Sequence, residues 1–595
     1  MARLGRAVLV GVGAATALAG LARYGVGRVQ AEERTAFYAW QQSVPSGSIT
    51  TLKAYSRETV VDVTVTDKDG KPVHGLTRAD FTVKEDGKVQ AIRSFEEFGK
   101  AAPVDAKELP KLPPNVYTNL QPPPSSEATN ILWLDFVNAA PVIAASCCSN
   151  KRLEINNDPT TGPHSLALAM DRQRHVKQYA MQYLQKMPAG TRVAVLGAAY
   201  PNRLHILQGV TSDSALLSAA VDSMKYDTDA IAVNPITWTT QQEMRNRMTL
   251  ESLQQIAADL AGIKGRKNLI WFTTGIPRIT DPHLRLRDYS PELKKAYGLL
   301  AAAQVTVFPV WVRGVPADGD PIWEDWGAEE LSMESVAEAT GGTAFYNSND
   351  LKAGIAKAID TGSDYYTLSY VPPGSEYDGR HHTIKLETDK PGLHLTYRDE
   401  YYAEDPSKMT PAPGLTLAAT LPAGGPVDMR LTMGRAMPTS QQILFDVGVE
   451  SGADTVKATD PQGTILGTLD PVVKAKLKDK PLIRYDFNYA IPARQIAFTP
   501  GPNGTHNGSL ELDIAVYDAD AKLVTGLSQT VKMPLSDDKY RQFVQGPFRI
   551  SQQIDLPAGQ FFVRIGILDR TSNKVGTLEI PLTVTKGSGA VTAGR

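Results

Sequence analysis

The sequence has almost no cysteine. Its only two cysteines, Cys147 and Cys148, are adjacent in a chain of 595 residues. A disulfide scaffold and a zinc site built from several cysteines are therefore excluded. The chain also lacks an excess of positive charge, because 62 Lys and Arg face 64 Asp and Glu and leave a formal net charge of −2. Proteins that bind nucleic acid through its phosphates need a basic face, so no nucleic-acid partner is expected.

Familiar catalytic motifs are missing as well. No pair of histidines has the spacing of a zinc hydrolase, and no Gly-x-x-x-x-Gly-Lys-Ser/Thr phosphate loop occurs. No Gly-x-Ser-x-Gly sequence forms a nucleophile elbow between a strand and a helix. The chain is therefore predicted not to be an enzyme.

One long uncharged stretch is present, at the amino terminus. Arg3 and Arg6 precede residues 7–22, which are apolar or small but fall short of the ~20 apolar residues that a membrane-spanning helix needs. Residues 1–31 are therefore predicted to be a secretory signal, or alternatively an uncleaved anchor. Either one carries the rest of the chain across a membrane, so the protein is expected in the periplasm, at the cell surface or secreted. Any membrane contact is expected only through this segment.

Two stretches alternate apolar and polar residues with a period of two. Val61, Val63 and Val65 alternate with polar residues within 55–100, and the pattern returns within 364–404. It predicts antiparallel strands with one buried face. About 40 residues are too few for a stable sandwich. Two outcomes therefore stay open, in which the stretches complete one β module or form separate pieces. Residues 101–128 are rich in proline and are predicted to be a linker.

Residues 129–363 follow a different pattern, in which short continuous apolar runs are separated by stretches of helical periodicity. Such runs are typical of strands that are covered on both faces. Strands that alternate with helices form βαβ crossovers, so a central, mostly parallel sheet with helices on both faces is predicted. The runs are Ile131–Leu134, Val193–Leu196, Leu269–Phe272 and Val305–Phe308.

Residues 405–595 return to alternation. Leu444–Val449, Leu510–Ile514 and Phe561–Ile567 are separated by clusters of turn residues at roughly the spacing of a β-sandwich. This region is predicted to be all-β and Ig-like. The whole chain is thus expected to be a multidomain protein that combines an α/β domain with all-β modules.

The first apolar run of the α/β region ends at Asp135. In an open α/β sheet, ligands bind beyond the carboxyl ends of the strands, so a carboxylate at this place is expected to face a crevice. Asp135 could instead accept hydrogen bonds from local backbone amides, as aspartates often do in turns.

Five blocks in a fixed order resemble the von Willebrand factor type A fold and, more narrowly, the bacterial VWFA-related domain family. The preceding segments Val61–Val65 and Leu76–Phe81 resemble that family's amino-terminal β module, and the similarity covers about residues 55–404. The resemblance implies a Rossmann-like type A domain flanked by β-sandwich modules. The five blocks are Ile131–Asp135, Met181–Ala194, Leu207–Asp213, Gly265–Phe272 and Ala339–Tyr346.

Type A domains commonly hold Mg²⁺ at a metal-ion-dependent adhesion site. By this resemblance Asp135 matches the first Asp of the Asp-x-Ser-x-Ser loop and Thr211 matches the Thr of the second loop, while Asn138 offers an amide oxygen. Val137 and Ala139 replace the two serines of that loop.

The third loop of that motif is changed too. Residues 273–275 read Thr-Thr-Gly, which leaves out the expected Asp. Because Mg²⁺ prefers six well-placed oxygens, a degenerate site that binds Mg²⁺ weakly at best is expected, and a metal-free recognition surface is favoured.

Together these observations predict an exported, non-enzymatic, adhesion-type protein that binds a protein or cell-surface ligand. The expected contact residues are Asp135, Asn138, Thr211 and Thr274. Two alternatives stay open. A metal-dependent hydrolase or chelatase-like subunit would use the same carboxylate, although the sequence offers no general base beside it. A purely structural envelope scaffold would use none of these residues.

Overall fold

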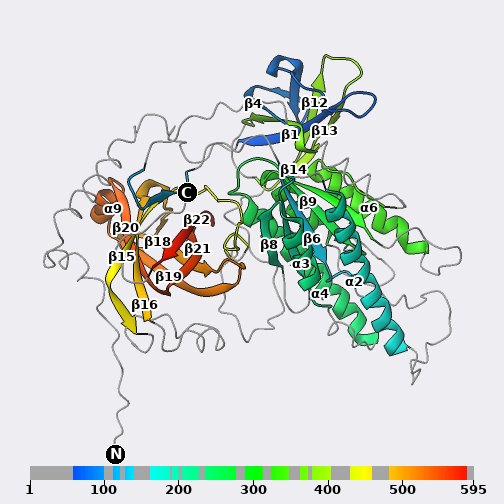
Figure 1. Cartoon of the computed structure of the whole chain (residues 1–595). Coiled ribbons are helices and arrows are strands. Elements are labelled where there is room, and N and C mark those ends of the chain that lie inside the picture. Colours follow the sequence, from blue (N-terminus) through cyan, green and yellow to red (C-terminus); the bar gives the residue numbers. More distant parts are fainter. Residues whose placement is uncertain are drawn as a thin grey trace, which may run out of the picture.

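The computed structural model describes fourteen stretches of the chain. They form an amino-terminal β-sandwich, an α/β body and a carboxyl-terminal β-sandwich (Figure 1). The predicted signal or anchor and the two cysteines lie outside the described residues. The described residues are 58–99, 112–120, 128–139, 161–187, 190–199, 204–226, 235–276, 289–312, 323–346, 362–372, 378–403, 429, 431–457 and 481–585.

The amino-terminal sandwich combines strands from two distant parts of the sequence. One sheet has the order β13-β1-β11-β4 and the other β14-β12-β2-β3. Of the two arrangements that the sequence left open, the structure has the one in which both stretches share a core, because β1 pairs with β11 and β2 with β12. The elements are β1 (Thr59–Thr66), η2 (Arg78–Asp80), β2 (Phe81–Glu85), β3 (Lys88–Gln90), β4 (Ile92–Phe98), β11 (Tyr365–Tyr370), β12 (His381–Thr388), β13 (His394–Thr396) and β14 (Glu400–Tyr402).

The α/β body contains a five-stranded sheet in the order β10-β9-β6-β7-β8. The predicted mostly parallel sheet is confirmed, since β10, β9, β6 and β7 are parallel neighbours and only the edge strand β8 is antiparallel. The elements are β6 (Thr129–Asp135), α2 (Thr161–Lys186), β7 (Val193–Ala198), β8 (His205–Thr211), α3 (Ser214–Ser223), α4 (Pro235–Leu260), β9 (Lys267–Thr273), α5 (Ser290–Ala302), β10 (Val305–Trp311) and α6 (Trp323–Thr340).

Helices cover both faces of this sheet. Ile131 and Trp133 of β6 lie in one core with residues of α4, α5 and α6, whereas Leu132 and Leu134 lie in a second core with residues of α2 and α3. Alternate residues of a strand point to opposite faces, so a continuous apolar run is what a doubly covered strand needs.

The carboxyl-terminal sandwich packs the sheet β20-β16-β15-β5 against a sheet that contains β17, β18, β21 and β22, with β19 paired to β18. Both sheets contribute to one apolar core. The remaining elements are β5 (Val116–Thr118), β15 (Asp446–Lys457), β16 (Pro481–Pro492), η6 (Ala493–Gln495), β17 (Thr499–Pro500), η7 (Pro502–Gly504), β18 (His506–Tyr517), β19 (Leu523–Leu535), α9 (Asp537–Phe543), β20 (Pro547–Pro557), β21 (Gly559–Asp569) and β22 (Lys574–Val584).

Strand β5 corrects the prediction that residues 101–128 are only a linker. Val116–Thr118 pair with β15 at the edge of the carboxyl-terminal sandwich. The next residue, Asn119, is fully buried, donates from Nδ2 to the carbonyls of Ser440 (3.1 Å) and Ile443 (2.7 Å), and accepts from the backbone N–H of Phe445 (2.8 Å). The chain therefore visits the carboxyl-terminal sandwich before it enters the α/β body.

Within the ranges that the structure describes, none of the helices is both long and apolar enough to cross a membrane.

Candidate functional site

The carboxyl ends of β6 and β9 meet at one edge of the α/β sheet. The two strands are parallel neighbours in a register that places Trp133 beside Trp271 and Leu134 beside Phe272. The two indole rings stack with centroids 4.5 Å apart. Asp135, the last residue of β6, therefore lies next to Thr273, the last residue of β9, at the position where α/β sheets bind ligands.

The Asp135 carboxylate accepts four hydrogen bonds. Oδ1 accepts from the backbone N–H of Asn138 at 3.1 Å. Oδ2 accepts from Nδ2 of Asn138 at 2.7 Å, from Nε1 of Trp271 at 2.9 Å and from Oγ1 of Thr273 at 3.0 Å. Asp135 has no exposed surface. Burial raises the pKa of Asp135, and the four hydrogen bonds oppose that shift.

The same network fixes the turn that follows β6. Asn138 Nδ2 also donates to Oγ1 of Thr249 in α4 at 2.8 Å. Thr274 Oγ1 donates to the backbone carbonyl of Asn138 at 3.0 Å. Asn138 is thus held by β6, α4 and the end of β9 at once. The alternative in which Asp135 accepts a local backbone amide is confirmed by the Asn138 N–H bond, although the carboxylate also bonds residues far away in the sequence.

Three of the four predicted contact residues come together, and Thr211 does not join them. Asp135 is the partner of Ala198 at the end of β7, whereas Thr211 is the partner of Val193 at its start. Five residues of strand separate the two places by about 16 Å. The pairing of Thr211 with Asp135 was therefore wrong, because β8 runs antiparallel and returns its last residue to the amino end of the sheet.

The residues at this edge do not fit a Mg²⁺ ion. Three of the four donors to Asp135 are N–H groups, whose hydrogens would repel a cation at the same oxygens. Val137 and Ala139, at the places of the two serines, are buried apolar side chains. With Thr211 at the far end of the sheet, the predicted set of Asp135, Asn138 and Thr211 cannot surround one ion.

Exposure limits what a partner can touch. Asp135 and Thr274 are 0% exposed and Asn138 is 8% exposed. In this conformation Asp135 and Thr274 hold the edge of the sheet rather than meet a ligand. The prediction of direct contact through Asp135 and Thr274 therefore does not hold for this structure, because neither side chain has exposed surface.

Sequence reasoning missed three members of the cluster, and of these Thr273 was noted only as part of the changed loop over residues 273–275. Thr249 gives no signal, because it is one more residue in a stretch of helical periodicity. Trp271 was assigned only to an apolar strand, although an indole that is buried inside a sheet usually needs an acceptor for its N–H. That requirement, together with the parallel neighbour ending in Asp135, is the signal that could have joined them.

The amino ends of the strands carry buried cations and are covered. Burial lowers the pKa of Lys267 to about 7, with Asp62 opposing the shift, and its Nζ donates to the carbonyl of Ile263 at 2.7 Å. Arg266 donates to Oγ1 of Thr64 in β1 at 3.0 Å and lies over the Tyr365 ring. Through these contacts the amino-terminal sandwich packs on the amino ends of the strands, opposite the edge that contains Asp135.

A cleft of about 400 Å³ lies between β8 and the carboxyl-terminal sandwich, and its lining includes His205, Gln208, Arg435 and Tyr517. Arg435 is paired with Glu579 at 2.6 Å, and the Tyr517 hydroxyl donates to the carbonyl of Met433 at 2.8 Å. These two bonds tie residues 433 and 435 to strands β18 and β22 of the sandwich, and the N–H of Val210 in β8 donates to the carbonyl of the neighbouring Ala436 at 3.0 Å. We therefore interpret the cleft as a groove between β8 and the sandwich.

Comparison with known proteins gives similarity to solved structures only. No protein-family model and no curated protein matches the chain. An aerotolerance-related membrane protein from Bacteroides fragilis is 12% identical, with 39% of this chain and 98% of that chain covered and a TM-score of 0.23. The vWF domain of the type V pili tip protein Mfa5 from Porphyromonas gingivalis is 11% identical, with 40% and 94% covered and a TM-score of 0.22.

A longer match is the pilus adhesin SpaC from Lactobacillus rhamnosus GG, which is 11% identical, with 82% of this chain and 57% of that chain covered and a TM-score of 0.23. At identities and TM-scores this low, the likeness establishes neither membership of a family nor an activity. What is established is a mixed α/β body, with one antiparallel edge strand, joined to antiparallel β-sandwiches.

Proposed function

We propose that the chain is an exported, non-enzymatic recognition protein that binds a protein or cell-surface ligand at the carboxyl ends of β6 and β9. In this proposal the α/β body is a type A domain of the VWFA-related kind. One observation carries it: the buried carboxylate at the expected ligand edge is fully engaged by four neutral donors, which hold the following turn in one conformation.

This arrangement favours recognition over catalysis. A general acid or base needs an oxygen or nitrogen that can reach the substrate and exchange a proton with it. Asp135 has no exposed surface, and its donors are amide, indole and hydroxyl groups that do not titrate near neutral pH. The hydrolase or chelatase-like alternative is therefore disfavoured, because Asp135, the carboxylate that it would use, cannot reach a substrate.

Recognition at this edge is proposed to be metal-free. A type A domain that binds through Mg²⁺ needs hydroxyl and carboxylate oxygens aimed at a single point. Here N–H groups occupy the carboxylate, and a preorganised turn replaces the ion as the device that fixes the binding surface. Asp135 is then a positioning residue, and the contact surface is formed by chain around it.

The other two bodies have supporting roles. The amino-terminal sandwich covers the amino ends of the strands, and the carboxyl-terminal sandwich packs beside β8, where the N–H of Val210 donates to the carbonyl of Ala436 at 3.0 Å. Export is proposed from the apolar segment that follows Arg3 and Arg6 in the sequence.

A photo-crosslinking experiment in intact source cells tests the location of the binding surface. Tyr346 is half-buried and follows Phe345, which bridges Val310 near the carboxyl end of β10. We expect benzoyl-phenylalanine at Tyr346 to give a discrete adduct that persists with EDTA and is weakened by Asp135→Asn. The matched control is the same substitution at half-buried Tyr540 in α9. An adduct at Tyr540 alone would overturn the proposed surface, and no adduct at either position would favour the scaffold.

Calorimetry separates the metal-free proposal from its alternatives. Mg²⁺ or Mn²⁺ titrated into the full chain should give the same heat for the natural protein and for Asp135→Asn. Stoichiometric binding that is lost in the variant would restore the metal-ion-dependent site. Hydrolytic turnover that depends on the added ion and on Asp135 would favour the enzyme.

A further inference from the structure

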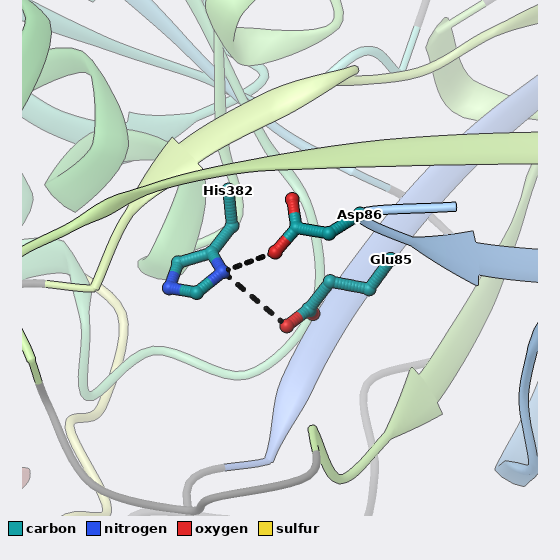
Figure 2. Close-up of side chains that lie close together, drawn as sticks. All are labelled: Glu85, Asp86 and His382. Carbon is teal, nitrogen blue, oxygen red and sulfur yellow. Dashed lines mark hydrogen bonds and ion pairs between the residues drawn. The ribbon is translucent and has the colours of Figure 1, made fainter. Parts of the chain in front are cut away.

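Three side chains with metal-binding atoms meet on the amino-terminal sandwich (Figure 2). Glu85 ends β2, Asp86 opens the turn to β3, and His382 is the second residue of β12. The antiparallel pairing of β2 with β12 places Glu85 beside Ile384. One ligand atom from each of the three residues lies within 4.8 Å of the other two.

The distances suit a shared ion. His382 Nδ1 lies 2.8 Å from Asp86 Oδ2 and 3.6 Å from Glu85 Oε1. Two ligand atoms of a tetrahedral ion, each at about 2.1 Å, lie about 3.4 Å apart. The distance to Glu85 is close to the spacing that a bound zinc-like ion imposes. The distance to Asp86 is that of a hydrogen bond, which an ion bound between the two atoms would replace.

The oxygen of each carboxylate that does not face His382 accepts hydrogen bonds from neighbouring residues. Glu85 Oε2 accepts from the hydroxyls of Tyr370 at 2.6 Å and Tyr401 at 2.9 Å. Asp86 Oδ1 accepts from the backbone N–H of Thr383 at 2.9 Å. These bonds leave Oε1 and Oδ2 aimed at the centre of the cluster, so a ligand would meet oxygens that are already oriented.

The histidine has the support that metal-bound histidines usually have. Its second ring nitrogen, Nε2, lies 3.3 Å from Oδ1 of Asp378. A carboxylate on the far nitrogen fixes the ring and strengthens the metal-facing nitrogen as a ligand. The ring also stacks on Tyr401 with centroids 5.3 Å apart.

We propose that Glu85, Asp86 and His382 bind one divalent transition-metal ion of the zinc class, with water in the fourth position. An imidazole with two carboxylates favours Zn²⁺ over Mg²⁺ or Ca²⁺, which take oxygen ligands. The ligands come from both sequence stretches of the sandwich, so the ion clips its two halves together. Glu85 is 4% exposed, and a cation beside it offsets the cost of a buried negative charge.

Zinc binding by the full chain tests the proposal. After removal of metal with EDTA, the chain is titrated with ZnCl2 alone by calorimetry. We expect one site that His382→Gln weakens at least about 100-fold and that Asp378→Asn weakens about 10- to 100-fold. The matched control is His381→Gln, since His381 lies on the same strand and pairs with Glu400 at 2.7 Å but does not face the cluster. It should bind as the natural chain does.

Two further measurements keep the test decisive. Thermal melts with and without Zn²⁺ show whether each variant folds, and Zn²⁺ should raise the melting temperature of the natural chain but not of His382→Gln. If His382→Gln does not fold, Glu85→Gln replaces it. The visible spectrum of bound Co²⁺ should lack the thiolate charge-transfer band that binding by Cys147 or Cys148 would give.

Three results would overturn the proposal. They are no binding by the natural chain at about 100 µM Zn²⁺, equal binding by His382→Gln, and equal loss in His381→Gln. Each would leave His382 as a histidine held by hydrogen bonds between carboxylates.

Discussion

Asp135 and Glu85 are both buried carboxylates at the end of a β-strand, yet their oxygens face opposite kinds of group. Asp135 accepts from N–H donors on both oxygens and from one O–H donor on Oδ2, so this carboxylate is fully hydrogen-bonded. Among the residues that the structure describes, Glu85 has hydrogen-bond donors on Oε2 only, whereas Oε1 faces an imidazole nitrogen 3.6 Å away. Burial at a strand end therefore does not define a ligand site. The proposed zinc site differs in that one Glu85 oxygen faces another ligand atom at 3.6 Å, beyond hydrogen-bond distance.

The largest effect on stability is expected when Asp135, the fully hydrogen-bonded carboxylate, is removed. Asp135→Ala removes the acceptor of the buried Trp271 indole and one acceptor each of Thr273 and Asn138, which keep their bonds to Gly275 and Thr249. We expect the α/β body to lose about 3–5 kcal/mol of unfolding free energy. Urea unfolding followed by the fluorescence of the stacked Trp133 and Trp271 measures it.

Asp135→Asn is the control, because it keeps the size and one acceptor oxygen and should lose less than the alanine variant. A loss below about 1 kcal/mol in Asp135→Ala would mean that the four hydrogen bonds are not what holds this edge.

Asp513 carries a third carboxylate, and it differs from both Asp135 and Glu85 because one of its oxygens has no partner among the described residues. Burial raises the pKa of Asp513 to about 6, and its Oδ1 is buried without a hydrogen-bond partner in the described part of the chain. Because the folded pKa lies above the ordinary value of 3.8, its contribution to stability is present below about pH 4 and is lost as pH rises through 6.

Asp513→Asn should therefore stabilise the carboxyl-terminal sandwich by about 2 kcal/mol at pH 7.5 and have almost no effect at pH 4. Thermal unfolding at the two pH values measures the difference. Equal effects at both would show that Asp513 does not titrate between them.

Thr273→Val removes one donor from Asp135 and keeps the shape of the side chain. Three donors remain, so the expected loss is about 1 kcal/mol in the same urea experiment. A loss as large as that of Asp135→Ala would assign the role of the edge to Thr273 and its bonds to Gly275 instead.

The smallest effect on stability is expected at the cluster of Glu85, Asp86 and His382 when no metal is present. The Asp86 side chain is 49% exposed, so Asp86→Asn should change the melting temperature in EDTA by an amount equivalent to less than about 0.5 kcal/mol. With Zn²⁺ present, the natural chain alone should gain stability. A large loss in EDTA would indicate that Asp86 serves the hairpin rather than an ion.

Local patterns of apolar and polar residues predicted much of the fold. The alternation around Val61 predicted sandwich strands, and the continuous runs predicted a doubly covered, mostly parallel sheet that ends at Asp135. Strand direction was less accessible. The pattern of β8 does not state that it runs antiparallel, so Thr211 was placed at the wrong end of the sheet.

The partners of the two carboxylates lay beyond sequence reasoning for a related reason. Trp271 follows Asp135 by 136 residues, and His382 follows Asp86 by 296. No spacing rule joins such positions, because their contact depends on strand order and register. The proline-rich segment hid β5 for the opposite reason, since three residues are too few for a period.

The position of strand β5 in the sequence also affects the order in which the carboxyl-terminal sandwich can assemble during synthesis. Val116–Thr118 leave the ribosome about 330 residues before β15, the strand with which they pair. The edge strand of the carboxyl-terminal sandwich is thus synthesised long before the strand with which it pairs. A fragment starting at residue 405 would be born without that edge, and a nascent chain stalled before residue 446 would carry an orphan strand for a chaperone to shield.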